Sequence, residues 1–146
     1  MRVVICGSPQ WTYNEIVKDV IARLKGEARA SGTKLLVIHG GEYGPETVAQ
    51  EYCRKLGIDT MVQEAVKVRG QNSYFRRNEL MLNYHKPDLV VGFALSFKES
   101  AVPADIIKRA EAKGIKTKAI DYESIVRRTP DDIASRHAKG FIYESK

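Results

Sequence analysis

Short β-branched runs alternate with amphipathic segments along most of this 146-residue chain, and this alternation restricts the fold more than any other feature. Arg2 to Cys6 (RVVIC) is an unbroken run of the kind found in strands that are covered on both faces. From Asn14 to Leu24, apolar residues recur at three- and four-residue spacing, which predicts a helix that buries one stripe and ends near Gly32. A strand followed by a packed helix is therefore the first unit of the fold.

The same unit recurs as far as Ile120. Further strands are predicted at Lys34 to His39, Thr60 to Val66, Leu89 to Ala94 and Thr117 to Ile120, and further helices from Pro45 to Gly57, through Leu80 to Tyr84 and from Pro103 to Lys113. Because crossovers between parallel strands are right-handed and usually helical, this order predicts an α/β fold. We expect a single Rossmann-like, doubly wound parallel sheet of about five strands with helices on both faces. The domain is predicted to span residues 1–121. Residues 122–146 are predicted to form a C-terminal helical extension, in which Thr129 can cap and Pro130 can open a short helix.

Several classes of protein are disfavoured by the composition. The longest apolar runs, such as Leu89 to Leu95, are far shorter than the roughly 18 residues that a membrane helix needs, so no membrane partner is predicted. The N-terminus lacks the pattern of a secretory signal, and Cys6 and Cys53 form no CxxC pair, which together favour a cytoplasmic protein with buried thiols. His85 and His137 have no partner at metal-ligand spacing, so neither a metal nor a cofactor is predicted.

The basic excess is concentrated in one part of the chain. The formal net charge is +6, and residues 67–118 carry 11 Lys or Arg against 5 Asp or Glu, while the rest of the chain is balanced. Such an excess favours an acidic partner, either a phosphorylated small molecule or a nucleic-acid backbone. A solvated basic face without a partner is the alternative.

Glycine-bearing loops follow the first two predicted strands. Gly7-Ser8 follows the first, and Gly40-Gly41-Glu42-Tyr43-Gly44 follows the second. Ligands of open parallel sheets bind outside the carboxyl ends of the strands, where a missing Cβ lets the backbone approach a phosphate and a helix N-terminus supplies amides and positive dipole. These loops therefore predict a phosphate-bearing ligand, and purely structural turns are the alternative.

Three ordered motifs carry a family resemblance. Cys6-Gly7-Ser8 with Trp11, His39-Gly40-Gly41 with Gly44, and Arg77-Asn78 with Met81 occur in this order at compatible spacings. They resemble the GSRxW, HGGAxGAD and RNxxM motifs of the YspA-like branch of the SLOG superfamily, over Arg2 to about Ile120. The resemblance implies a Rossmann-like fold, bacterial or phage origin, frequent homodimers and recognition of nucleotide-derived ligands. Relatives in the superfamily include the LONELY GUY phosphoribohydrolases, which cleave nucleoside monophosphates, and DprA, which binds single-stranded DNA.

The sequence departs from the family pattern near the expected ligand. Pro9 stands where the family has Arg, and Pro45-Glu46 stands where it has Ala-Asp. The family loop PGGxGT is replaced by Ala94 to Glu99, which has neither the glycine pair nor the threonine. The residues that match the catalytic glutamate of the phosphoribohydrolases are Ala101 and Val102, which cannot ionise. Cleavage of a glycosidic bond needs a carboxyl group nearby, so a hydrolase would have to use another residue.

Three functions are compatible with these residues. The leading hypothesis is a module that binds or senses a nucleotide-derived small molecule. Backbone donors, cationic and polar side chains and a stacking ring would contact the ligand. The candidate residues are Gly7, Ser8, Trp11, Gly40, Gly41, Gly44, Arg76, Arg77, Asn78, Ser96 and Lys98. The second is a nucleosidase or phosphoribohydrolase whose acid is Glu46 or Glu79, with Glu99 as a further candidate. The third is a protein that binds single-stranded nucleic acid.

Each of several side chains also has a purely structural interpretation. Arg76 and Arg77 would then belong to a solvated helix face or pair with Glu79, and Trp11 would be a core residue. His39 is predicted to be a hydrogen-bonded residue at a strand end and not a general base. Tyr43 and Tyr74, like Trp11, are candidates for stacking on a base.

Overall fold

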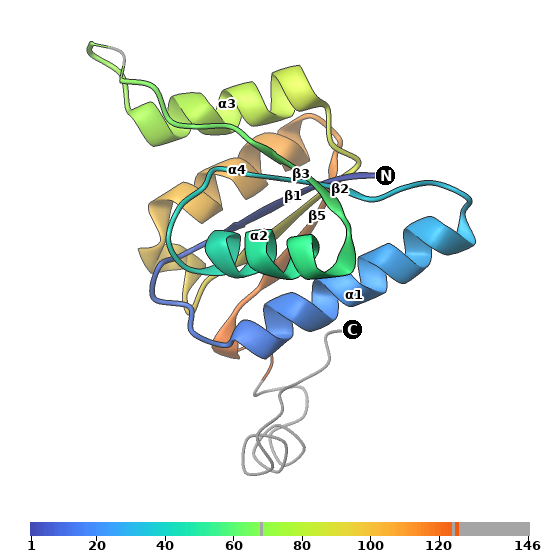
Figure 1. Ribbon diagram of the computed structural model, residues 1–146. Coiled ribbons are helices and arrows are strands. Elements are labelled where there is room, and N and C mark those ends of the chain that lie inside the picture. The colour runs from blue at the N-terminus through green and yellow to red at the C-terminus, as the bar shows by residue number, and fades with distance from the viewer. Residues whose placement is uncertain (68, 124, 126–146) are drawn as a thin grey trace.

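The computed structural model describes residues 1–67, 69–123 and 125. Within these residues the chain forms a five-stranded, all-parallel sheet in the order β3-β2-β1-β4-β5, as Figure 1 shows. The strands are β1 (Arg2–Gly7), β2 (Leu36–His39), β3 (Asp59–Val62), β4 (Leu89–Phe93) and β5 (Lys116–Ile120). The helices are α1 (Asn14–Ala30), α2 (Pro45–Leu56), α3 (Ser73–His85) and α4 (Ala101–Ala112), with a 3-10 turn, η1 (Phe97–Glu99), before α4. The predicted α/β, doubly wound fold is confirmed.

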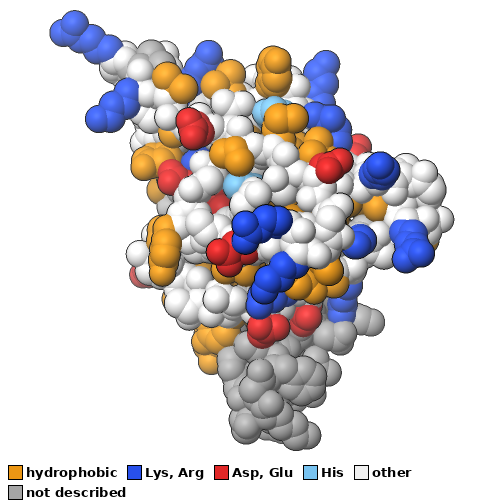
Figure 2. All heavy atoms as spheres, viewed as in Figure 1, with side chains coloured by type: hydrophobic (Ala, Val, Ile, Leu, Met, Phe, Trp, Pro, Cys, Tyr) orange, Lys and Arg blue, Asp and Glu red, His pale blue; other side chains and the backbone are white. Residues whose placement is uncertain are grey.

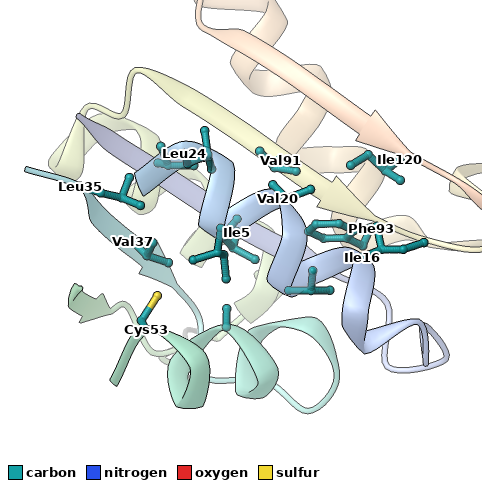
Figure 3. Packing of buried hydrophobic residues seen from close by; sticks show 14 of the residues in the cluster. Ile5, Ile16, Val20, Leu24, Leu35, Val37, Cys53, Val91, Phe93 and Ile120 are labelled. Carbon is teal, nitrogen blue, oxygen red and sulfur yellow. The ribbon is translucent and has the colours of Figure 1, made fainter. Parts of the chain in front are cut away.

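The two faces of the sheet are covered by different helix pairs. Helices α1 and α2 cover one face and α3 and α4 the other (Figure 1). Successive side chains of a strand point to opposite faces, so Val3 and Ile5 enter the first core while Val4 and Cys6 enter the second. Figure 3 shows the first core, in which strand residues meet the apolar stripe of α1. Burial on both faces explains why β1 is apolar without alternation.

Some element boundaries differ from the predicted ones because a strand ends where its partner ends. The third strand was predicted to reach Val66, but β3 ends at Val62, whose partner His39 is the last residue of β2. One further bond, from Gln63 N to His39 O at 2.8 Å, closes the ladder. Helix α4 begins at Ala101 and includes Pro103, because a proline in the first turn removes no helical hydrogen bond.

The direction of the chain crossovers reverses at the centre of the sheet. Strand β1 pairs with β2 on one side and with β4 on the other, so the chain winds outward from β1 in both directions. Loops on either side of this reversal leave an opening at the carboxyl ends of the strands. The fold therefore places its natural ligand position between the loops after β1 and β4.

None of the helices within the described residues is both long and apolar enough to cross a bilayer. The predicted helical extension over residues 122–146 lies for the most part outside the described residues, as do Thr129 and Pro130.

Candidate functional site

A cleft of about 400 Å³ opens at the carboxyl edge of the sheet, at the reversal between β1 and β4. This carboxyl-edge cleft is bordered by the loop after β1, the loop after β2 and the starts of α2, α3 and α4, which Figure 1 shows on one side of the molecule. Its lining residues are Gly7, Ser8, Pro9, Gln10, Glu42, Tyr43, Glu46, Tyr74, Arg77, Glu99, Ser100, Ala101, Val102 and Pro103. Three helix N-termini, each with positive dipole, therefore meet at the cleft.

A second hollow, of about 520 Å³, lies at the opposite edge of the sheet and is lined by residues such as Met1, Pro87 and Gly114. It is larger, but it lies at the amino ends of the strands. Doubly wound sheets bind ligands at the carboxyl ends, so the carboxyl-edge cleft is the candidate site.

Arg77 is the buried cation of the carboxyl-edge cleft. Its side chain is 1% exposed, its Nη1 lies 3.4 Å from Glu42 Oε1, and its guanidinium lies 5.3 Å from the centre of the Tyr74 ring. The Nε atom is buried and has no hydrogen-bond partner among the residues that the structure describes. A buried donor without a partner costs about 1–3 kcal/mol, and a water, an ion or a ligand can remove this cost. The Arg77 guanidinium thus has unused capacity for an anion.

Glu46 is a buried carboxyl group at the start of α2. Its side chain is 2% exposed, and Oε1 accepts a hydrogen bond from Gly40 N at 2.5 Å. Burial raises the pKa of Glu46, and this effect outweighs the Arg77 charge and the backbone hydrogen bonds from Gly40 and Glu42, which lower it. Glu46 therefore holds a proton more firmly than an ordinary glutamate, as a general acid must.

Two of the glycines are explained by contacts within the protein. A Cβ on Gly7 would lie 2.5 Å from Pro45 Cγ and 2.8 Å from Phe93 O. A Cβ on Gly40 would overlap the Arg77 guanidinium, with its Cζ atom at 2.6 Å. The missing Cβ atoms thus make room for the start of α2 and the end of β4 beside Gly7 and for a buried arginine beside Gly40, and Gly7 alone of the two also lines the cleft.

The other two glycines are required by the backbone of the loop after β2. Gly41 has φ of 74° and Gly44 has φ of 107°, values that other residues rarely adopt. Gly44 also lies against Ser8, whose carbonyl oxygen would be 3.1 Å from an added Cβ. Gly40, Gly41 and Gly44 allow the backbone path of this loop but do not line the cleft. Glu42 and Tyr43 are the residues of the loop that line it.

His39 is held as a neutral side chain at the end of β2. Its Nδ1 accepts a hydrogen bond from Gly41 N at 2.9 Å, and its Nε2 lies 2.6 Å from Gln50 Oε1. Burial lowers the pKa of His39, so the ring is neutral near pH 7. These contacts agree with the predicted structural role at a strand end.

Trp11 corrects one prediction, because its ring is not available to a ligand. The side chain is 1% exposed and packs on Tyr13 and Phe93, at ring-centre distances of 5.3 and 5.6 Å. Its Nε1 donates to Tyr13 O at 3.2 Å, which satisfies the buried indole N–H. Trp11 is therefore a core residue, and the exposed rings of the cleft are Tyr43 and Tyr74.

Helix α3 directs its predicted site residues to three different places. Arg77 faces the cleft, whereas Asn78 is fully buried and donates from Nδ2 to Val102 O and Asp105 Oδ2, both at 3.0 Å. Asn78 thus joins α3 to α4 and is not a ligand contact. Its Oδ1 is buried and finds no hydrogen-bond partner in the described part of the chain.

Arg76 and Glu79 lie on the exposed side of α3. Arg76 pairs with Glu79, and Glu79 also lies 3.4 Å from Arg109 Nη1 on α4. Neither lines the cleft, so the cleft does not support the ligand role predicted for Arg76 or the acid role predicted for Glu79, and both stay predictions. Pairs of this kind on a helix surface contribute little to stability.

The loop before α4 contributes different residues from those predicted. Ser96 and Lys98 do not line the cleft, whereas Glu99 and Ser100 do. The sequence offered no signal that separates these neighbours. Gln10 was also missed, although it follows Ser8, whose hydroxyl donates to Gln10 Oε1 at 2.5 Å. The cleft lining thus carries Glu42, Glu46 and Glu99 beside one buried cation.

The surface shows how the basic excess is distributed on one face. Figure 2 shows Lys and Arg side chains spread around this face with Asp and Glu between them, without a single basic patch. Within the described residues, no group of three or more His, Cys, Asp or Glu is placed to hold a metal ion.

Fold and cleft together define a Rossmann-like α/β protein with a ligand-sized cleft at the topological switch point. No protein-family model matches the chain, and no curated protein matches it. Among solved structures, the chain is similar to a universal stress protein from Archaeoglobus fulgidus, with 20% identity and a TM-score of 0.48, over 83% of this chain and 98% of that one. A likeness at this level carries no argument about function, and the fold stated above follows from the sheet topology.

Proposed function

We propose that the protein binds a small, phosphorylated, nucleotide-derived ligand in the carboxyl-edge cleft. The observation that carries the proposal is Arg77, a buried guanidinium that lines the cleft and keeps an unpartnered Nε. An anion is the partner that a forked, permanently charged donor accepts best. The three motifs described above support the same ligand class, since Arg77 is the residue of the third motif that reaches the cleft.

The surroundings of Arg77 suit the other parts of a nucleotide. The first amides of α4, at Ala101 and Val102, have no partner within the helix and suit a phosphate. The exposed rings of Tyr43 and Tyr74 offer faces on which a base can stack. Ser8 also lines the cleft, where its hydroxyl is held by Gln10 Oε1. The volume of about 400 Å³ lies within the usual range for small-ligand sites.

Thermal-shift measurements with a panel of ligands test the proposal. The panel contains mononucleotides, cyclic nucleotides, NAD, ADP-ribose and a short single-stranded oligonucleotide, each against wild type, Arg77→Lys and Arg76→Ala. Arg76→Ala is the matched control, because it removes a neighbouring arginine that lies outside the cleft. A ligand at 100 times its Kd adds about 2.7 kcal/mol, which raises the Tm by several degrees.

The expected result is that one small nucleotide raises the Tm of wild type and Arg76→Ala but raises that of Arg77→Lys much less. Equal shifts in all three proteins would remove Arg77 from the site. A response to the oligonucleotide alone, lost steeply as salt is raised, would favour single-stranded nucleic-acid binding instead. The expected homodimer stays a prediction, which sedimentation analysis of the same samples checks.

Hydrolysis of an N-glycosidic bond is the second candidate function, and Glu46 favours it. Its carboxyl group lines the cleft, and burial raises its pKa, so it can donate a proton to the base as the C–N bond breaks. Water then forms the new bond to the sugar carbon and returns a proton to the Glu46 carboxylate. Release of free base from a nucleoside monophosphate, lost in Glu46→Gln although the nucleotide still binds, would establish this activity. Binding without turnover would leave the protein as a binding or sensing module.

A further inference from the structure

Arg77 is already in contact with one carboxylate of the protein. Glu42 Oε1 lies 3.4 Å from Arg77 Nη1, which is a long contact for a charge-assisted hydrogen bond. The two partners differ sharply in exposure, since the Arg77 side chain is 1% exposed and the Glu42 side chain 37%. The cation is therefore fixed in the protein, while its anion is accessible from the cleft.

The two carboxylates near Arg77 are held in different ways. Glu46 belongs to α2, is 2% exposed and is fixed by Gly40 N at 2.5 Å. Glu42 belongs to the loop between β2 and α2 and borders the cleft directly. Its side chain can turn toward solvent without moving a helix or a strand, whereas Glu46 cannot. Glu42 is thus the one of the two that an incoming anion can displace.

We propose that Glu42 is an internal anion that competes with the anionic group of the ligand for Arg77. The inference rests on the proposed function, because it takes the ligand to carry an anion that reaches this guanidinium. Binding then exchanges one carboxylate for another anion and breaks a protein ion pair in doing so. A neutral nucleoside does not need to displace Glu42, so Glu42 lowers the affinity of charged ligands and leaves that of a nucleoside unchanged.

Calorimetric titration of three full-length proteins tests the exchange. The proteins are wild type, Glu42→Gln and Glu99→Gln, and the probes are inorganic phosphate, adenosine and guanosine monophosphates and the two nucleosides, all at one ionic strength. Glu99→Gln is the matched control: Glu99 also lines the cleft, and its loss changes the charge by the same unit without removing a partner of Arg77. Unchanged Tm values verify that both variants fold.

Glu42→Gln should bind the anionic probes about tenfold more tightly than wild type, the effect of removing one partly exposed charged contact. Glu99→Gln should strengthen the same binding less than about threefold, because its effect acts only through the screened field. Nucleoside affinity should not respond to Glu42→Gln. This pattern supports the exchange of Glu42 for the ligand anion.

The contrary outcomes separate this inference from the proposed function. If wild type binds the monophosphates and Glu42→Gln binds them equally or more weakly, Glu42 does not compete, and the proposed function stands without it. Equal strengthening of anion binding in Glu42→Gln and Glu99→Gln would also overturn the inference, because the loss of one negative charge anywhere in the cleft would then explain the effect. Failure of every probe to bind any of the three proteins would overturn the proposed function and this inference together.

Discussion

Gly40 is the position where the backbone, the buried cation and the buried acid of the cleft meet, so Gly40→Ala tests the architecture of the site. An added Cβ would lie 2.6 Å from Arg77 Cζ and 2.9 Å from Glu46 Oε1. Both side chains are at most 2% exposed, so neither can turn aside within the core. The Arg77 guanidinium must therefore leave its place, and Glu46 loses its nearby positive charge.

The expected loss of unfolding free energy is about 2–4 kcal/mol. Overpacking a core costs about 1–3 kcal/mol, and separating a buried charge from its partner raises the cost toward about 3–5 kcal/mol. At a urea dependence of about 1.5 kcal/mol/M, a loss of about 3 kcal/mol lowers the urea midpoint by about 2 M. Circular dichroism during urea unfolding at pH 7 measures this change.

Two further variants make the reasoning refutable. Gly26 lies in α1, and an added Cβ would meet no atom of the described residues within 4 Å apart from the neighbouring backbone of its own helix, so Gly26→Ala should instead stabilise the protein by about 0.5–1 kcal/mol. In a Glu46→Gln background, Gly40→Ala should cost at least about 1 kcal/mol less, because no buried acid then loses a charged partner. An unchanged midpoint for Gly40→Ala, or an equal cost in both backgrounds, would refute the assigned contacts.

Three other predictions use the same kind of measurement. Burial raises the pKa of Glu46 above its ordinary 4.5, so above that pH the folded protein retains a proton that the unfolded chain has released. Wild type should therefore lose stability relative to Glu46→Gln as the pH rises from 4.5 through the raised pKa, and parallel pH profiles would contradict this. Gly7→Ala should lower the free energy of unfolding by about 1–3 kcal/mol, since its Cβ would lie 2.5 Å from Pro45 Cγ. A urea midpoint equal to that of wild type would show that the backbone near Pro45 moves aside without cost. Tyr43→Ala should weaken nucleotide binding about tenfold, whereas Tyr84→Ala, which removes an equally exposed ring (77% in both) outside the cleft, should not, and calorimetry distinguishes the two.

The order and type of the elements could be predicted from the sequence because each depends on local pattern. The pattern of apolar residues in a segment reflects which of its faces are buried. The doubly wound sheet buries both faces of β1, which gives an unbroken apolar run, and one stripe of α1, which gives three- and four-residue spacings. Strand ends depend instead on the partner strand. β3 ends at Val62 because β2 ends at His39, and this pairing is not visible in either segment alone.

The candidate site was predicted less completely, and helix geometry explains why. Successive residues of a helix point about 100° apart, so Arg76, Arg77 and Asn78 cannot share one ligand. A signal for Arg77 was nevertheless present in the sequence. It is four residues before Met81 and eight before His85, which form the buried stripe of α3. Arginine on a buried stripe requires a partner inside the protein or a ligand, and no such requirement applies to Arg76.

Glycines pose a different problem, because a sequence shows that a Cβ is missing but not what uses the space. The loops after β1 and β2 were predicted to be open to a phosphate. In the structure Pro45 fills the space beside Gly7, and Arg77 fills that beside Gly40. Gly40 thus acts indirectly: it lets a buried arginine reach the carboxyl ends of the strands, where the charge of Arg77 faces the cleft. Ligand binding would then depend on the Arg77 side chain, for which Gly40 leaves room. Gly40→Ala and Arg77→Lys should therefore weaken the binding of the same ligand.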